Sequence, residues 1–368
     1  MARFFRDNVA ALDPYVPGEQ LRGRDVIKLN ANENPYPPSA KVLRALRAAS
    51  NDTLRLYPEP ASDSLRAAAA RVYGVGAEHI IAGNGSDELL TILLRCFVGP
   101  RDRVAYPMPT YSLYDTLVDI QGGIRAPVDY PADFSIPTSL AAQRAALTFL
   151  CNPNAPSGTL VRPEAIARLA KQVRGILVVD EAYIDFAAAT DVTAIPLIRR
   201  LPNLVVLRTF SKSFSLAGMR IGLAFAPKAI IDGMMKVKDS YNLNRLSAAA
   251  AIAALQDVES MRRNVRRIQR ERAALSRALE SMDFSVYPSE TNFVLARRPG
   301  TDMRAIQQAL KRRRILIRHF DVPGLTDCLR ISIGTPDEMR ALTTALRRAV
   351  ADADTAPVAP KPLRRRAC

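Results

Sequence analysis

The chain has 368 residues, 48% of them hydrophobic, and its excess of Lys and Arg over Asp and Glu gives a formal net charge of +16. At ~150 residues per domain this length indicates two domains, and the apolar content excludes wholesale disorder. No stretch approaches 18 consecutive apolar residues, which argues against a membrane-spanning helix.

The N-terminal sequence lacks a signal-peptide pattern, and the four cysteines are scattered without a CxxC pair. With only two histidines, the chain cannot supply a zinc framework, so we expect no metal site. Scattered thiols of this kind are typical of a reducing compartment, and we expect a cytoplasmic protein.

Residues 1–30 are too few for a domain, so we expect an arm that packs on the rest of the chain. From residue 79 to 226 short apolar runs alternate with helical stretches such as 85–97 and 163–173. The predicted strands are HIIAGN, VAYP, IRAPV, LTFLCNP, GILVVDEAY, LVVLRTFS and GLAFA. Continuous apolar runs are typical of strands buried on both faces of a mainly parallel sheet. We therefore predict an α/β large domain over residues 31–240, with helices on both faces of the sheet.

The pattern changes after about Met234, where a long helical tract is predicted to run to about Met282. Strand-like segments follow, with one helix between them near 303–310. The last helix is predicted to begin at the capping box formed by Thr335 and Glu338. These elements predict a smaller α+β domain over residues 241–355. The basic tail 356–368 follows a Pro/Ala-rich segment, and we expect it to be disordered.

The densest positive charge lies between 258 and 279, where six arginines interleave with apolar residues: Arg262, Arg263, Arg266, Arg267, Arg270 and Arg272. This spacing predicts an amphipathic helix with a solvated cationic face. A nucleic-acid binder would concentrate its charge beside aromatic residues, so we expect no nucleic-acid partner and no membrane partner. The positive field would still help to attract anionic substrates.

Lys212 follows an apolar strand and lies between two serines in TFSKSFSLAGMRIG. At the C-terminal end of a strand in an α/β sheet, its side chain would reach the ligand crevice. A buried lysine with a lowered pKa can form a Schiff base, although a lysine at a strand end is weak evidence by itself.

Other polar residues stand at corresponding positions. Asp180 ends the run ILVVD, where an unpaired carboxylate would be costly, so it needs a cationic partner: an arginine or a protonated pyridine nitrogen. Tyr183 lies three residues further on, and Asn152 ends another apolar run; either could hydrogen-bond a ring oxygen. Residues 85–88 begin a helix whose free N–H groups form an anion site, which Arg220 could help to neutralise.

A lysine, a buried aspartate, a phenol, an amide and an anion site at the strand ends of one domain together indicate a pyridoxal-phosphate site. The sequence also resembles the histidinol-phosphate aminotransferase family, within the fold-type-I, class II aminotransferases. The matching segments run in family order from about residue 28 to 338 and include KLNANENPYPP, GNGSDE, YPMPTYSLY, NPNAPSG, DEAY, TFSKSFSLAGMRIG, ILIRHFDVPG and LRISIGTPDE. Three residues depart from the usual family pattern: Pro37, Ser157 and Ser213.

The resemblance implies a large domain with a mainly parallel seven-stranded sheet, pyridoxal 5′-phosphate as cofactor, and a homodimer. It implies that Lys212 carries the cofactor covalently and then moves the α-proton, and that Asp180 partners the ring nitrogen. It places Asn152 and Tyr183 on the ring hydroxyl oxygen and Tyr111 against the ring face. The remaining implied cofactor ligands are Gly85, Ser86, Asp87, Thr209, Ser211, Arg220 and, from the neighbouring subunit, Tyr57. The implied substrate ligands are Arg330, Tyr15 and Asn32.

The expected reaction is transamination between L-histidinol phosphate and 2-oxoglutarate, in which one arginine receives either a phosphate or a carboxylate. An aromatic amino-acid aminotransferase of the same branch is the first alternative, and a phosphothreonine decarboxylase is the second. From a different class, a cofactor-dependent transcription regulator would need a helix-turn-helix domain before the enzyme body, and residues 1–30 leave no room for one. A nucleic-acid-binding module would leave Lys212 and Asp180 unexplained.

Overall fold

The computed structural model describes residues 4–12, 19, 21, 23 and 25–355. The large domain is built on a seven-stranded sheet in the order β2-β8-β7-β6-β5-β3-β4. Neighbouring strands are parallel except for β8, which pairs antiparallel with both β2 and β7. The strands are β2 (Ile80–Gly83), β3 (Arg103–Met108), β4 (Ile124–Asp129), β5 (Leu147–Cys151), β6 (Ile176–Asp180), β7 (Leu204–Thr209) and β8 (Gly222–Phe225). The prediction of a mainly parallel α/β sheet is confirmed, and each of the seven predicted strands is present.

Helices cover both faces of this sheet, as expected when the central strands are apolar along their whole length. The helix predicted at 85–97 is α4 (Gly85–Phe97), and the one predicted at 163–173 is α6 (Pro163–Gln172), with Pro163 in its first turn. The other helices of this part are α1 (Asp7–Ala10), α2 (Ala40–Ala49), α3 (Asp63–Tyr73), α5 (Leu113–Gln121) and α7 (Lys228–Val237). Short 3₁₀ helices are η2 (Asp52–Arg55), η3 (Ala77–His79), η4 (Ala141–Gln143), η5 (Ile184–Phe186), η6 (Ile195–Arg199) and η7 (Ala217–Met219).

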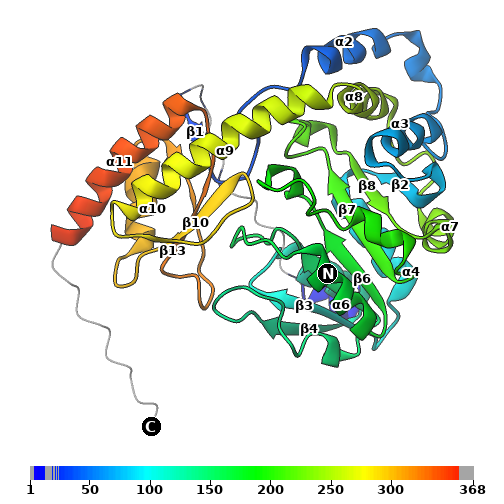
Figure 1. Ribbon diagram of the computed structural model, residues 1–368, viewed down its shortest axis with the longest axis horizontal. Coiled ribbons are helices and arrows are strands. Elements are labelled where there is room, and N and C mark those ends of the chain that lie inside the picture. Colours follow the sequence, from blue (N-terminus) through cyan, green and yellow to red (C-terminus); the bar gives the residue numbers. More distant parts are fainter. Residues whose placement is uncertain (1–3, 13–18, 20, 22, 24, 356–368) are drawn as a thin grey trace.

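The small domain contains a four-stranded antiparallel sheet in the order β12-β13-β10-β9. Its strands are β9 (Ser285–Val286), β10 (Phe293–Arg297), β12 (Arg318–His319) and β13 (Cys328–Ser332). Helices α9 (Val258–Glu280), α10 (Met303–Arg312) and α11 (Pro336–Thr355) pack around it (Figure 1). The predicted capping box is present: the Thr335 N–H donates to Glu338 at 2.7 Å and the Glu338 N–H donates to Thr335 at 3.4 Å.

The helical tract predicted from about Met234 to Met282 is interrupted twice. Helix α7 ends at Val237, α8 spans Arg245–Leu255, and α9 begins at Val258. Helix α8 packs against α2 and α3 of the large domain, whereas α9 runs along the small domain (Figure 1). The domain boundary at residue 240 stays a prediction.

The described residues of the N-terminal arm contact both parts of the molecule. The side chain of Asn8 donates to the Asp119 carbonyl at 2.6 Å on the large domain. Further along, β1 (Ile27–Lys28) pairs in parallel with β11 (Ile315–Leu316) of the small domain. No helix in the described ranges is long and apolar enough to cross a membrane.

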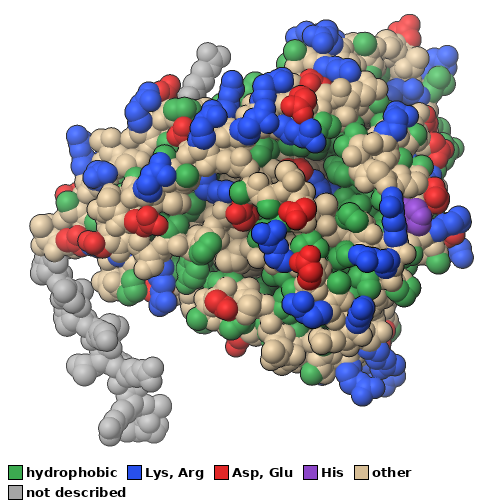
Figure 2. Space-filling view, viewed as in Figure 1, with side chains coloured by type: hydrophobic (Ala, Val, Ile, Leu, Met, Phe, Trp, Pro, Cys, Tyr) green, Lys and Arg blue, Asp and Glu red, His purple; other side chains and the backbone are tan. Residues whose placement is uncertain are grey.

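Basic side chains gather along the outer face of α9 (Figure 2). Five of the six predicted arginines are exposed there, as a solvated cationic face requires. Arg272 is the exception and corrects the prediction, because it is buried, 3.1 Å from Glu290, and donates to the Phe186 and Thr291 carbonyls. Its guanidinium therefore ties α9 to the loops at the domain junction.

Candidate active site

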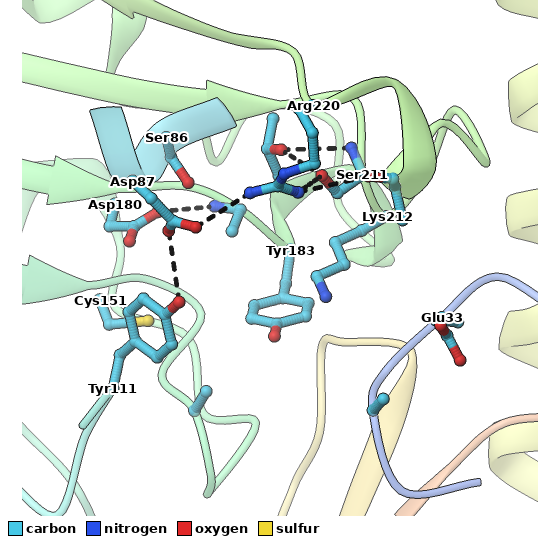
Figure 3. Close-up of a pocket in the computed structure, with 15 residues that line it drawn as sticks. Glu33, Ser86, Asp87, Tyr111, Cys151, Asp180, Tyr183, Ser211, Lys212 and Arg220 are labelled. Carbon is cyan, nitrogen blue, oxygen red and sulfur yellow. Dashed lines mark hydrogen bonds and ion pairs between the residues drawn. The ribbon is translucent and has the colours of Figure 1, made fainter. Parts of the chain in front are cut away.

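A cavity of about 230 Å³ opens at the C-terminal ends of β5, β6 and β7, where α4 begins (Figure 3). Short loops after parallel strands meet at this edge, which is the usual ligand site of an α/β sheet. The lining includes nine of the predicted site residues: Ser86, Asp87, Tyr111, Asp180, Tyr183, Thr209, Ser211, Lys212 and Arg220.

Asp180 is the last residue of β6 and is only 3% exposed. The Tyr114 hydroxyl donates to one carboxylate oxygen at 3.0 Å, and the Ala182 N–H donates to the other at 3.2 Å. Burial nevertheless raises the pKa of Asp180 to about 6, because two neutral donors replace only part of its lost hydration. The carboxylate is thus suited to a cationic partner in the cavity.

Lys212 follows β7 and points into the cavity beside Tyr183, with its amine 5.7 Å from the centre of the tyrosine ring (Figure 3). Burial lowers the pKa of the Lys212 amine to about 8, and the charge of Arg330 lowers it further, against Glu33 and Asp87. Within the described ranges this amine makes no hydrogen bond or ion pair. A lysine in this state has a substantial neutral fraction near pH 8 and can act as a nucleophile or base.

Tyr183 forms part of the cavity wall, and its hydroxyl accepts a hydrogen bond from the Asn32 amide at 3.0 Å. Burial raises the pKa of this phenol to about 12, so it remains protonated at neutral pH. The sequence prediction placed Asn32 on the substrate, and that contact stays a prediction. The Asn32 amide is turned onto Tyr183 and Ser332, and Asn32, like Arg330, is absent from the lining of the cavity.

The predicted anion site, here named the anion cup, lies at the first turn of α4 next to β8. The Asn84 side chain does not cap α4, so the N–H groups of its first turn face the cavity end. Gly85 has φ +79°, and a Cβ on Gly222 would come within 2.5 Å of the Gly85 carbonyl carbon. Only glycine at these two positions permits so close an approach.

Arg220 adds positive charge to this cup. Its guanidinium lies 3.0 Å from the Asp87 carboxylate and 3.5 Å from the Ser211 hydroxyl, which also accepts from Thr209 at 3.0 Å. Tyr111 lies across the cavity, and its hydroxyl donates to Asp87 at 3.3 Å. Hydroxyl groups, a guanidinium and a helix N-terminus together suit a phosphate group.

Asn152 does not take the place that the sequence suggested. Its amide is buried, donates to the Val161 carbonyl at 2.9 Å and accepts from the Val161 N–H at 2.7 Å. Both polar ends therefore fix the loop after β5, and Ala155 from the same NPNAPSG segment lines the cavity instead. Among residues that line the cavity, Tyr183 alone keeps the predicted role toward a ring hydroxyl oxygen.

Arg330 lies on β13, with its guanidinium 5.3 Å from the Phe293 ring centre and 5.6 Å from that of Phe320. It donates to the Asn30 carbonyl at 3.0 Å. Its charge adds to the effect of burial that lowers the pKa of Lys212, and it opposes the effect of burial that raises the pKa of Tyr183. Two other predicted residues lie apart. Tyr57 is 78% exposed and stacked on Tyr241 away from the cavity, and Tyr15 lies outside the described residues.

Sequence reasoning missed three residues of the site: Glu33, Tyr114 and Cys151. Glu33 lines the cavity opposite Lys212 and pairs with Lys28 at 2.8 Å. Glu33 in the segment KLNANENPYPP and Tyr114 in the segment YPMPTYSLY both lie in matching segments, which was a usable signal. Cys151 carried no such signal, because it reads as an apolar position of a strand.

The residues of the cavity fit pyridoxal phosphate. A reactive amine, a buried carboxylate and a phenol surround one space, and the glycines at the cup leave the close approach that a bound phosphate needs. The model of the class I and II aminotransferase family matches residues 24–346. The fold and the site therefore define a pyridoxal-phosphate-dependent aminotransferase.

Relatives define the branch. A histidinol-phosphate aminotransferase of Trichormus variabilis is 42% identical over 94% of this chain and 99% of its own length. One from Geotalea uraniireducens is 46% identical over 93% of this chain and 98% of its own. The solved histidinol-phosphate aminotransferase of Sinorhizobium meliloti, in complex with pyridoxal-5′-phosphate, superimposes with a TM-score of 0.89 at 31% identity, covering 95% and 98% of the two chains. The chain belongs to the histidinol-phosphate aminotransferase family.

Proposed function

We propose that this enzyme transfers the amino group of L-histidinol phosphate to 2-oxoglutarate, giving imidazole acetol phosphate and L-glutamate in histidine biosynthesis. The observation that carries the proposal is the position of Arg330 on β13, where its guanidinium lies against the rings of Phe293 and Phe320. From there its charge acts on both Lys212 and Tyr183. A planar guanidinium can bind either a phosphate or a carboxylate in a bidentate way, so one residue can serve both substrates.

Pyridoxal phosphate, when bound, supplies an aldehyde that reacts with amines and a pyridine ring that accepts electrons as the α-proton leaves. Lys212 would hold the cofactor, and its amine would then move the α-proton of the substrate. Asp180 would keep the ring nitrogen protonated. Tyr183 would donate to the ring hydroxyl oxygen, and Arg220 with the first turn of α4 would neutralise the phosphate.

The homodimer belongs to the same proposal. Tyr57 lies with Tyr241 in a surface depression of about 500 Å³ that also contains the exposed side chains of Leu54 and Leu56. An apolar surface hollow around an exposed tyrosine suits a second copy of the chain. In such a dimer Tyr57 would reach the cofactor phosphate of its partner, and the enzyme would work in the cytoplasm.

Substrate competition tests the proposal. We expect kcat/KM with 2-oxoglutarate to be at least tenfold higher for histidinol phosphate than for phenylalanine or histidine. The same preparation should release no carbon dioxide from phosphothreonine. A preference for phenylalanine would instead identify an aromatic amino-acid aminotransferase, and carbon dioxide release would identify a decarboxylase.

A further inference from the structure

The arm residue Asn32 is held in a buried position between the two domains. It is 2% exposed and has φ +54°, in the left-handed region that asparagine tolerates better than most residues. Its N–H donates to the Ser332 hydroxyl oxygen at 2.9 Å, and its carbonyl accepts from Asn292 at 2.9 Å. Its backbone is thus fixed to the small domain, while its side chain reaches Tyr183 of the large domain.

Each hydrogen bond in this contact has a defined donor and a defined acceptor. The Ser332 oxygen already accepts from the Asn32 N–H, and its own hydrogen is donated to Asn32 Oδ1 at 3.0 Å. That bond places the Asn32 carbonyl oxygen toward Ser332 and the amide nitrogen toward Tyr183. Asn32 Nδ2 then donates to the Tyr183 oxygen at 3.0 Å. Because the Tyr183 oxygen accepts there, the hydrogen of the phenol remains available for a group in the cavity.

We propose that Ser332 and Asn32 are positioning residues that hold the Tyr183 phenol as a hydrogen-bond donor toward the cofactor. This inference rests on the proposed function, because it assumes that Tyr183 faces the cofactor ring. Asn32 thereby acts through the phenol of Tyr183. In this relay Ser332 donates a hydrogen bond to Asn32, and Asn32 donates one to Tyr183.

The relay begins on the strand that carries the anion-binding arginine. Arg330 and Ser332 are two residues apart on β13, so their side chains lie on the same face. Both bind the arm: Arg330 donates to the Asn30 carbonyl at 3.0 Å, and Ser332 donates to Asn32. A substrate anion bound to Arg330 would therefore lie on the same strand that orients the phenol.

Two pairs of variants test the relay. Asn32→Asp keeps the shape but offers only acceptors, so the phenol would turn its hydrogen away from the cavity; Asn32→Gly fits the positive φ without adding charge. Ser332→Ala removes the hydroxyl and Ser332→Thr keeps it. Ser276→Ala is the matched control, since it loses one serine hydrogen bond, to the Arg272 carbonyl, away from the arm.

The readout is the pH midpoint at which the absorption of the bound cofactor changes. The ring oxygen accepts a hydrogen bond from the protonated lysine nitrogen and so stabilises its proton. A phenol that also donates to this oxygen weakens that stabilisation, so losing the phenol donor should raise the pH midpoint. We expect a rise of about one pH unit in Asn32→Asp and smaller rises in Asn32→Gly and Ser332→Ala. We expect none in Ser332→Thr or Ser276→Ala. The charges that face Lys212, from Glu33, Asp87, Arg220 and Arg330, are unchanged in every variant.

Turnover gives a second readout. In Asn32→Asp, kcat should fall at least tenfold while KM for both substrates changes less than threefold, because the anion site is intact. Equal midpoints in Ser332→Ala and Ser332→Thr would overturn the proposal, as would a shift confined to Asn32→Asp, which would assign the effect to the new charge. A wild-type enzyme that binds the cofactor but does not use histidinol phosphate would refute the proposed substrate and leave the midpoint test valid.

Discussion

Asp180 is expected to destabilise the cofactor-free chain while serving the reaction. Burial raises the pKa of its carboxyl from the ordinary 3.8 to about 6. Between these values the folded chain holds a proton that the unfolded chain has lost, so folding stability falls as the pH rises through this window. A difference of about two pKa units corresponds to about 3 kcal/mol, which is present at low pH and lost above pH ~6.

The Asp180→Asn substitution removes the charge and keeps the shape. The Ala182 N–H retains an oxygen acceptor, and the Tyr114 hydroxyl can accept from the new amide. Without cofactor, the variant should melt about 4 °C above the wild type at pH 7.5. This shift is the gain of about 3 kcal/mol in the free energy of unfolding divided by the unfolding entropy, which is large for a chain of this length. The difference should close toward pH 4, and transamination should fall by ~10²-fold or more.

Thermal melting of both chains, freed of cofactor, between pH 4 and 8 measures this difference. Asp191→Asn serves as the control, because Asp191 is 84% exposed and its loss should change little. If the cofactor-free Asp180→Asn chain melted at or below the wild-type temperature at pH 7.5, the buried carboxylate would not be destabilising and the reasoning would be refuted.

Three further predictions concern the other site residues. Lys212→Ala should abolish transamination while the chain still folds, and borohydride reduction of the wild type should label Lys212 and no other lysine. Arg330→Ala should lower kcat/KM for histidinol phosphate and glutamate together, each by ~10-fold or more, and Arg330→Lys should rescue only partly; loss with glutamate alone would require a separate phosphate site. Hybrid dimers of Lys212→Ala and Tyr57→Ala chains should regain one working site, provided each parent is impaired; verified hybrids without activity would make each subunit self-contained.

The large-domain sheet could be predicted because its signal is local. Each of its strands is a short apolar run that ends at polar or turn residues, and these runs read correctly from β2 to β8. The interruptions in the helical tract after Met234 could not be predicted in the same way. Only short breaks separate helices α7, α8 and α9, and only tertiary packing shows that α8 covers α2 and α3. Arg272 illustrates the same limit, because burial beside Glu290 depends on a loop that periodicity does not place.

Side chains at strand ends were predictable to different degrees. Lys212 and Asp180 could be predicted as site residues because a charge at the end of an apolar strand is costly unless it has a partner. Asn152 has the same sequence position at the end of β5, yet its amide turns to Val161. An amide can satisfy itself on local backbone, whereas a buried charge cannot, so strand-end position is a reliable guide for charges and a poor one for amides.

The residues that follow Asp180 and Lys212 are also charged or polar, and they are absent from the lining of the cavity. Glu181 follows Asp180 and accepts from the Thr193 hydroxyl at 2.6 Å and the Ala194 N–H at 2.5 Å. Its third partner is Arg208, at 3.3 Å, which is buried on the same side. Strand alternation requires Glu181 and Asp180 to face opposite ways, so the segment DEAY secures Asp180 with a buried ion pair behind it.

The lysine is secured from the same side. Ser213 follows Lys212 and donates to the Asp185 carboxylate at 2.5 Å, and Asp185 is also paired with Arg208. Arg208 thus joins the segment after β6 to the loop after β7 through buried charges, and losing one partner would leave an uncompensated charge. Ser213 departs from the usual family pattern, and this contact gives it a physical reason: its hydroxyl adds a hydrogen bond that fixes the backbone next to Lys212. The chemistry in the cavity therefore depends on a second polar layer behind the strand ends, which adjacent sequence positions supply.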